Sequence, residues 1–126
     1  MERRLALHLQ KTSHLMTFTG HGEGYVAVNG QRHEQPLVVL AGAVRTDWPA
    51  TGFADLTVAH FDYFLELKPE VILIGTGARQ QFAHPELYRN LLQAGIAIEF
   101  MDTPAACRTY NILVAEDRKV VAAVLP

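Results

Sequence analysis

The chain has 126 residues, of which 49% are apolar and 19% are charged, and its formal net charge is −2. These values indicate one soluble globular domain, because the chain is too short for two ordinary domains and too apolar to be disordered. They exclude a strongly basic nucleic-acid-binding surface, and no apolar run approaches the roughly 20 residues of a membrane-spanning helix, which excludes membrane insertion.

The single cysteine, Cys107, rules out an internal disulfide framework and fits a reducing compartment. The N-terminal stretch as far as Met16 has no long apolar segment and no small-residue cleavage site, which argues against a secretory signal. We therefore expect one domain over residues 1–126, with residues 1–14 as a loosely attached N-terminal strand, and we expect it in the cytoplasm.

The first part of the chain has the pattern of β-structure. Alternating apolar and polar residues predict a strand at Leu5–Gln10, and Leu15–Gly20 is a second candidate. Asn29-Gly30 lies between two extended segments, and this pair accepts the positive φ angles that a type I′ hairpin turn requires. Pro36–Gly42 is the next predicted strand, so we expect an N-terminal β-hairpin region.

The period of the apolar residues changes after a loop at Thr46–Leu56. Their spacing then predicts a helix over roughly Thr57–Lys68, which Pro69 ends. Strands and helices alternate from there. The predicted strands are Val71–Gly75, Ile96–Asp102 and Lys119–Leu125, and the predicted helices are Pro85–Ala94 and Thr103–Ala115, the latter with Thr103 as its N-cap. This order predicts the α/β fold class: a layered domain with a mixed β-sheet and a C-terminal β-α-β-α-β unit.

Residues 110–118 admit a second interpretation, a hairpin that turns at Asp117-Arg118 with Ile112–Val114 as a strand. The helix is favoured, because Ala106 and Tyr110 fit helical spacing and a Thr-Pro pair is a strong helix start.

The order of motifs from Gly75 onward resembles one uncharacterised domain family, which includes mitochondrial respiratory complex I assembly factor three and the adipogenesis-associated domain protein of animals. The residues that carry the resemblance are Gly75-Thr76-Gly77, Met101-Asp102-Thr103, Ala105-Ala106, Thr109-Tyr110-Asn111, Leu113, Glu116, Arg118 and Val120. The resemblance implies a compact α/β domain with a mixed sheet, and it brings no catalytic residue with it. Its eukaryotic members imply work with protein partners in respiratory-complex assembly.

One position departs from the family. The family usually has a glycine between the acidic residue and the arginine, where this chain has Asp117. A glycine there suits the left-handed residue after a helix, and Asp tolerates that conformation at some cost. The departure therefore supports a helix followed by a turn.

The Gly75-Thr76-Gly77 loop is similar to a nucleotide-binding turn only at first sight. A dinucleotide fingerprint needs a third glycine where this chain has Gln80, and Pro85 starts the helix too late for its N–H groups to reach a phosphate. Two interpretations remain: the glycines let the chain leave a buried strand, or the loop forms a cleft for a small ligand or anion. The candidate cleft residues are Gly75, Thr76, Gly77, Arg79, Arg108 and Tyr110.

Residues for catalysis or metal binding do not form a recognisable set. Cys107 lies in the first turns of a predicted helix, where the helix dipole lowers the pKa of a thiol, but single cysteines on helices are mostly small core residues. The six histidines have none of the His-x-His or His-Glu-x-x-His spacings of metal sites. We expect no metal, no cofactor and no assigned catalytic residue.

Aromatic residues gather around the first predicted helix. Trp48 and Phe53 fall in the preceding loop and Phe61 on the helix. Exposed aromatics at such a junction suit a protein interface, while the alternative is ordinary core filling. Trp48, Phe53 and Phe61 are therefore the candidate partner surface.

Together these observations favour a non-enzymatic domain that binds a protein partner and assists the assembly or stabilisation of a respiratory or other multi-subunit complex. Association of the chain with itself is compatible with this hypothesis. The competing hypothesis is a small-ligand or anion-binding protein, or an enzyme, that uses the cleft at Gly75-Thr76-Gly77.

Overall fold

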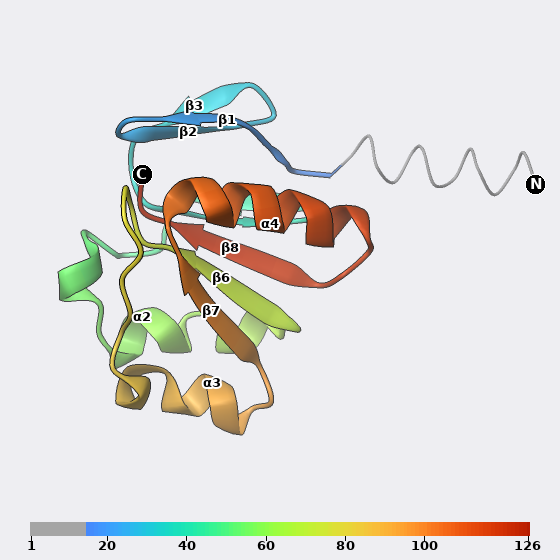
Figure 1. The fold of residues 1–126 in the computed structure, drawn as a ribbon. Helices are drawn as coiled ribbons and strands as arrows, with labels where there is room; N and C mark the ends of the chain where they lie inside the picture. Colours follow the sequence, from blue (N-terminus) through green and yellow to red (C-terminus); the bar gives the residue numbers. More distant parts are fainter. Residues whose placement is uncertain (1–14) are drawn as a thin grey trace, which may run out of the picture.

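The computed structural model describes residues 15–126, so the predicted strand at Leu5–Gln10 lies outside the described residues. In this part of the chain the fold consists of two β-sheets and three α-helices (Figure 1). The strands are β1 (Phe18–Gly22), β2 (Tyr25–Val28), β3 (Gln31–His33), β4 (Leu37–Leu40), β5 (Ala43–Arg45), β6 (Val71–Gly75), β7 (Ala97–Met101) and β8 (Val120–Val124). The α-helices are α2 (Val58–Asp62), α3 (Arg89–Gln93) and α4 (Thr103–Ala115), and short 3-10 helices are η1 (Phe53–Asp55), η2 (Leu65–Leu67) and η3 (Pro85–Tyr88).

The smaller sheet is the antiparallel array β1-β2-β3. Asn29 and Gly30 connect β2 to β3 with φ angles of 47° and 84°, the two positive values of a type I′ turn. The predicted hairpin is therefore confirmed. The strand before it begins and ends later than Leu15–Gly20, because β1 continues to Gly22 in order to pair with Tyr25.

The larger sheet has the strand order β5-β4-β8-β6-β7. β6 runs parallel to both of its neighbours, whereas β4 is antiparallel to β8 and β5. The prediction of a mixed sheet is therefore confirmed. β5 was not predicted, since it is a three-residue strand that pairs with β4 across the tight turn after Leu40.

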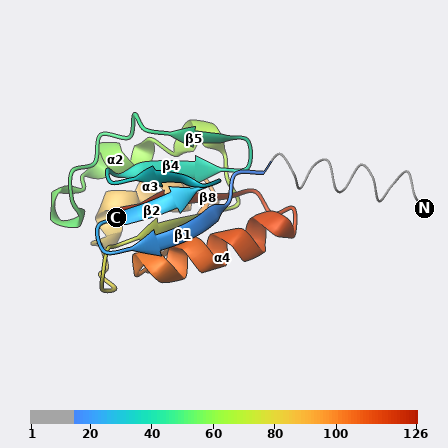
Figure 2. The same cartoon turned by 90° about the horizontal axis from the view of Figure 1, so that it is seen from above.

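The larger sheet has a hydrophobic core on each face. In β6, Val71 and Leu73 pack against α4 and the smaller sheet, while Ile72 and Ile74 pack on the side of α2 and α3. Figure 1 shows the resulting layers, with α4 and the smaller sheet on one face of the larger sheet and α2 and α3 on the other, and Figure 2 shows α4 alongside β1. This arrangement explains why β6 is a continuous apolar run, since both of its faces are buried.

The two predicted helices in the middle of the chain are shorter than expected. The segment Thr57–Lys68 divides into α2 and η2, because Leu65 and Leu67 both pack against the core and positions two apart point about 200° apart on an α-helix. Lys68 then takes a left-handed φ of 48°. Likewise, the predicted helix Pro85–Ala94 divides into η3 and α3.

α4 has the predicted bounds, so the hairpin alternative for residues 110–118 is wrong. Asp117 has a φ of 62°, the left-handed conformation that its family position predicted. The N-cap is Asp102 and not Thr103: the Asp102 carboxylate accepts from the Ala105 N–H at 2.8 Å. Thr103 is buried, and its hydroxyl donates instead to the Leu125 carbonyl.

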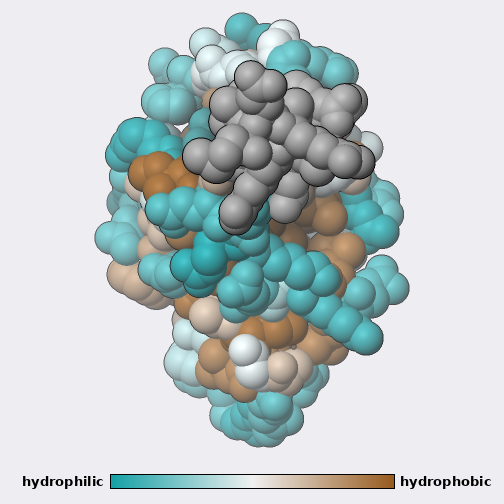
Figure 3. Space-filling view, turned by 90° about the vertical axis from the view of Figure 1, so that its right-hand side faces the viewer, coloured by the Kyte–Doolittle hydropathy of each residue, from teal (hydrophilic) through white to brown (hydrophobic). Residues whose placement is uncertain are grey.

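Figure 3 shows the end of the molecule where α4 ends and the described chain begins. Apolar residues reach the surface of this face in separate places, with polar residues between them.

Candidate functional site

The Gly75-Thr76-Gly77 loop leaves β6 beside the start of α4. The Thr76 hydroxyl donates to the Arg79 carbonyl at 2.7 Å and accepts from the Gln81 N–H at 3.1 Å. The Gly77 N–H donates to the Thr103 hydroxyl at 2.9 Å, and the Gly77 carbonyl accepts from the Thr103 N–H at 2.9 Å. These polar groups of the loop are therefore used within the chain.

The two glycines of the loop have structural reasons to be there. A Cβ on Gly75 would lie 2.9 Å from a Val124 methyl carbon and 3.2 Å from the Ala106 Cβ, so this glycine lets α4 approach the sheet. Gly77 has a φ of 101°, which side-chain-bearing residues rarely adopt. The interpretation as a strand exit thus has direct geometric support.

The six residues of the predicted ligand cleft do not meet. Tyr110 is buried in the core, where its hydroxyl donates to the Met16 carbonyl at 2.8 Å and burial raises the pKa of its phenol. Arg108 is exposed and borders a hollow of about 240 Å³ with β1. Gly77 borders a different hollow of about 310 Å³, and Thr76 and Gly77 border a third of about 300 Å³.

The 310 Å³ hollow has a wall that sequence reasoning missed. Its far side is the turn between β1 and β2, where His21 and Glu23 alternate with Gly22 and Gly24. The Gly-Glu-Gly triplet was the available signal, since a turn with two glycines can come close to another loop.

The residues of the candidate partner surface are more buried than the sequence suggested. Trp48 and Phe61 are 3% and 0% exposed, so the core-filling alternative is correct for both. The Trp48 ring packs against Phe64, and its indole N–H donates to the His60 carbonyl at 3.0 Å. Phe53 is half-buried.

The most exposed aromatic side chain among the described residues is Phe82, with 71% of its surface accessible. It lies in the loop between β6 and η3, and its ring centroid is 6.2 Å from that of Phe100. Phe53 contacts the same Phe100 ring edge-on at 6.2 Å. The signal in the sequence was an aromatic residue in a stretch without apolar periodicity, Gln80 to His84.

Cys107 is not an activated thiol. It is buried, and burial raises its pKa to about 12 even though the neighbouring Arg108 charge acts in the opposite direction. Its pocket lies on the α4 side of the larger sheet, whereas His60 and His84 belong to segments associated with the other face. The approach of either histidine to Cys107 is thereby excluded.

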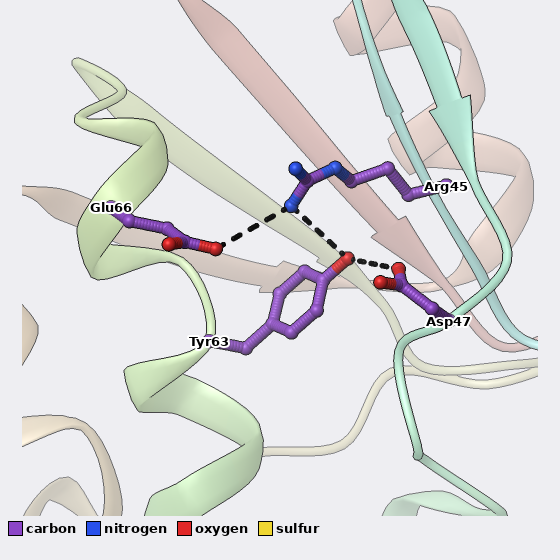
Figure 4. Close-up of polar contacts among 4 residues, drawn as sticks. All are labelled: Arg45, Asp47, Tyr63 and Glu66. Atoms are coloured by element: carbon purple, nitrogen blue, oxygen red, sulfur yellow. Dashed lines mark hydrogen bonds and ion pairs between the residues drawn. The ribbon is translucent and has the colours of Figure 1, made fainter.

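A polar cluster ties the end of β5 to the α2–η2 segment (Figure 4). The Tyr63 hydroxyl donates to an Asp47 carboxylate oxygen at 2.6 Å, and Arg45 Nη1 lies 3.5 Å from that hydroxyl and 3.7 Å from a Glu66 carboxylate oxygen. Burial and the bond to Asp47 both raise the pKa of Tyr63, so the phenol keeps its proton and serves as a donor. Sequence reasoning missed this cluster because its members share no local motif.

The part of the chain that the structure describes shows no group of three or more His, Cys, Asp or Glu side chains arranged to hold a metal ion. Within residues 15–126, the longest apolar helix falls short of what a bilayer crossing requires.

The fold and these sites define a small α/β domain in which the polar groups of the Gly75-Thr76-Gly77 loop bond within the chain and the Phe82 side chain is exposed on a loop. The chain belongs to the family described as protein of unknown function (DUF498/DUF598), whose profile matches residues 18–125. The resemblance inferred from the motifs is confirmed.

Curated relatives include animal assembly factors and a bacterial membrane protein. The chain is 34% identical over 125 residues to the bovine protein named NADH dehydrogenase (ubiquinone) 1 alpha subcomplex assembly factor 3, and 39% identical over 101 residues to the zebrafish protein of that name. These matches cover 98% and 79% of this chain, but 67% and 58% of the relatives, so the chain spans only part of their length. It is also 31% identical to the 13 kDa major membrane protein of Francisella tularensis, over 92% of this chain and 95% of that protein.

Solved structures confirm the fold. A crystal structure of a Bordetella parapertussis protein is 46% identical, with a TM-score of 0.83, and the match covers 89% of this chain and 96% of that one. A solution NMR structure of a Bordetella pertussis protein, described as an Mth938-like domain, is 37% identical with a TM-score of 0.78, over 90% of this chain and 87% of that one. The fold is therefore Mth938-like.

Proposed function

We propose that this domain is a non-enzymatic protein-binding module that assists the assembly or stabilisation of a multi-subunit complex. The animal relatives bear the name of a complex I assembly factor, so a respiratory complex is the proposed setting. Because those relatives are longer than this chain, their role applies here as a proposal about the shared domain.

The observation that carries the proposal is the exposure of Phe82. Phe82 and Phe53 both contact the buried Phe100 ring, so the exposed Phe82 side chain lies beside a packed aromatic cluster. Exposed aromatic side chains beside a packed cluster are typical anchors of protein interfaces, because they bury a large area at little entropic cost. In Figure 1 the loop that carries Phe82 runs along the left side of the larger sheet in yellow.

The test is a pull-down from native lysate of the source organism, followed by mass spectrometry. The tagged Phe82→Ser variant should lose the specific partner, whereas Ile112→Ser should retain it. Ile112 is a matched control, because it is 60% exposed and lies on α4, on the opposite side of the larger sheet. Equal recovery of a partner by both variants, or no specific partner for the natural chain, would contradict the proposal.

The ligand hypothesis has less support, since the loop at Gly75-Thr76-Gly77 bonds to its own chain and Arg108 and Tyr110 lie elsewhere.

We also propose a cytoplasmic location, supported by the single, buried free cysteine, which needs no oxidising compartment. The Francisella relative named as a membrane protein makes fractionation the useful measurement: recovery in the membrane pellet after a high-salt wash would argue against the cytoplasm.

A further inference from the structure

The turn between β2 and β3 consists of asparagine followed by glycine, the pair most open to deamidation. Asn29 and Gly30 are both exposed. Glycine has no side chain to hinder its backbone nitrogen when that nitrogen attacks the preceding carboxamide. The other asparagines of the chain, Asn90 and Asn111, precede leucine and isoleucine, whose side chains hinder this attack. On local grounds, Asn29 is therefore the asparagine that reacts fastest.

The reaction needs only water as a second reactant. The deprotonated Gly30 backbone nitrogen forms a bond to the side-chain carbonyl carbon of Asn29, which closes a five-membered succinimide. The carboxamide nitrogen leaves as ammonia with the proton that Gly30 lost. Water then opens the ring at one of its two carbonyl carbons. The products are aspartate, or isoaspartate, in which the main chain runs through the former side chain and is one carbon longer.

The folded hairpin holds both reacting groups with other partners. The Gly30 N–H donates to the Thr19 hydroxyl of β1 at 2.9 Å, and this bond retains the proton that the reaction must remove. The Asn29 carboxamide oxygen accepts from the Thr17 N–H at 2.9 Å, and its nitrogen donates to the Leu15 carbonyl at 3.2 Å. The nitrogen and the carboxamide are thus each fixed by the chain around β1, so attack requires the turn to open.

The same carboxamide fastens the first described residues to the smaller sheet. Next to its bond with Leu15, Met16 donates its N–H to the Ala41 carbonyl at 3.0 Å and accepts from the Tyr110 hydroxyl at 2.8 Å. A carboxylate has no N–H to donate, so aspartate at position 29 would leave the Leu15 carbonyl without this donor. Isoaspartate would also lengthen the main chain inside a two-residue turn whose flanking strands pair directly.

We propose that Asn29 is a deamidation site that the folded hairpin protects, and that its conversion loosens the attachment of residues 15–17. Succinimide formation requires the bonds of both Gly30 and the Asn29 carboxamide to break, so folding slows it at least about tenfold. Deamidation therefore accumulates in molecules whose hairpin opens. This inference is independent of partner binding through Phe82, since the two loops carry different residues.

The first test compares deamidation of the folded chain with that of the chain in guanidinium chloride, both in warm, mildly alkaline buffer. Peptide mapping by mass spectrometry separates the two products at position 29 from unreacted Asn29, and Asn90 in the same digest is the internal reference. The folded chain should react at least about tenfold more slowly at Asn29. Equal rates in the two conditions would overturn the proposal.

Two matched variants test the part played by the Gly30 N–H. In the folded state, Thr19→Val should deamidate roughly fivefold faster than the natural chain, because the N–H loses its acceptor. Thr17→Val should stay within about twofold, since its hydroxyl makes only a 3.4 Å contact with the carboxamide and its N–H remains. Equal rates for the two variants, with circular dichroism showing both folded, would contradict protection by this bond.

The variant Asn29→Asp tests the consequence of the reaction. Hydrogen exchange of the Met16 N–H, measured by NMR, should be roughly fivefold faster than in the natural chain, because the segment has lost one of its bonds. Exchange at an unchanged rate would show that the carboxamide does not hold residues 15–17, and the second half of the proposal would fall.

Discussion

Single residues in this protein are constrained chiefly by close packing. Gly75 and Cys107 both lie where α4 meets the larger sheet, and both had candidate roles in chemistry on sequence grounds. The structure gives each a packing role, because neighbouring side chains of α4 and the larger sheet fill the space around them. Substitutions there should therefore change stability rather than activity.

We expect Gly75→Ala to destabilise the protein by about 1–3 kcal/mol, because its Cβ would overlap Val124 and crowd Ala106. Gly42→Ala is the matched control, since a Cβ at Gly42 meets no atom within 4 Å, and its effect should stay within about 0.5 kcal/mol. Urea unfolding of both variants gives the comparison. Equal free energies of unfolding for the two variants would show that α4 can move away from the larger sheet without loss of stability.

The Cys107 thiol should resist a disulfide reagent in the folded protein at pH 8, since burial raises its pKa to about 12 and blocks access. In denaturant the same thiol should react at once. Colorimetric titration with and without denaturant measures both rates, and fast reaction of the folded protein would disprove this picture.

At the scale of elements, α4 joins the two sheets. Its Asn111 side chain accepts from the Phe18 N–H at 2.9 Å and donates to the Phe18 carbonyl at 2.8 Å, so the amide pairs with the edge of β1 as another strand would. The T-shaped contact of Tyr110 with Phe18 lies beside these bonds. The smaller sheet therefore depends on α4 for its position.

Replacement of Asn111 by Ala should cost about 2 kcal/mol, because it leaves both backbone groups of Phe18 without their partner. Ile112→Ala, one residue further on the exposed face of α4, should change stability by less than about 0.5 kcal/mol. Thermal and urea unfolding measure the difference. A similar loss of stability in both variants would mean that Asn111 does not hold the smaller sheet.

At the scale of the whole molecule, acid should weaken a contact that joins the starts of β6 and β8. The Glu70 carboxylate accepts from the Lys119 N–H at 2.8 Å and lies 3.4 Å from Arg118 Nε. The backbone bond and the Arg118 charge lower the pKa of Glu70 below its ordinary 4.5. A carboxyl with a lowered native pKa stabilises the fold above its unfolded pKa, and this contribution disappears as the pH falls through the native value.

The natural chain should accordingly have a higher melting temperature than Glu70→Gln at pH 7, and the two should converge below about pH 4. Melting curves followed by circular dichroism from pH 3 to 7 measure this convergence. A gap between the two that stays constant over the whole range would exclude the ionised carboxylate as its source.

Residues with a local meaning were predictable from the sequence. Asn29-Gly30 specified its hairpin, the apolar run Val71–Gly75 specified a strand buried on both faces, and the spacing from Thr103 to Ala115 specified α4. Each of these signals works within a few neighbouring residues, through backbone conformation or hydrophobic period, and needs no distant partner.

Only the tertiary structure decided what lies beside what. Trp48 and Phe82 are both aromatic residues in loops, yet the first is buried against Phe64 and the second is exposed, because segments distant in sequence cover one and leave the other open. The same reason separated Tyr110 from the Gly75-Thr76-Gly77 loop and brought His60 to Pro49. The sequence by itself determined the Asn29-Gly30 hairpin, the buried strand β6, α4 and the family, through local backbone preferences and the order of motifs. The candidate sites depend on contacts that form only when the layers pack.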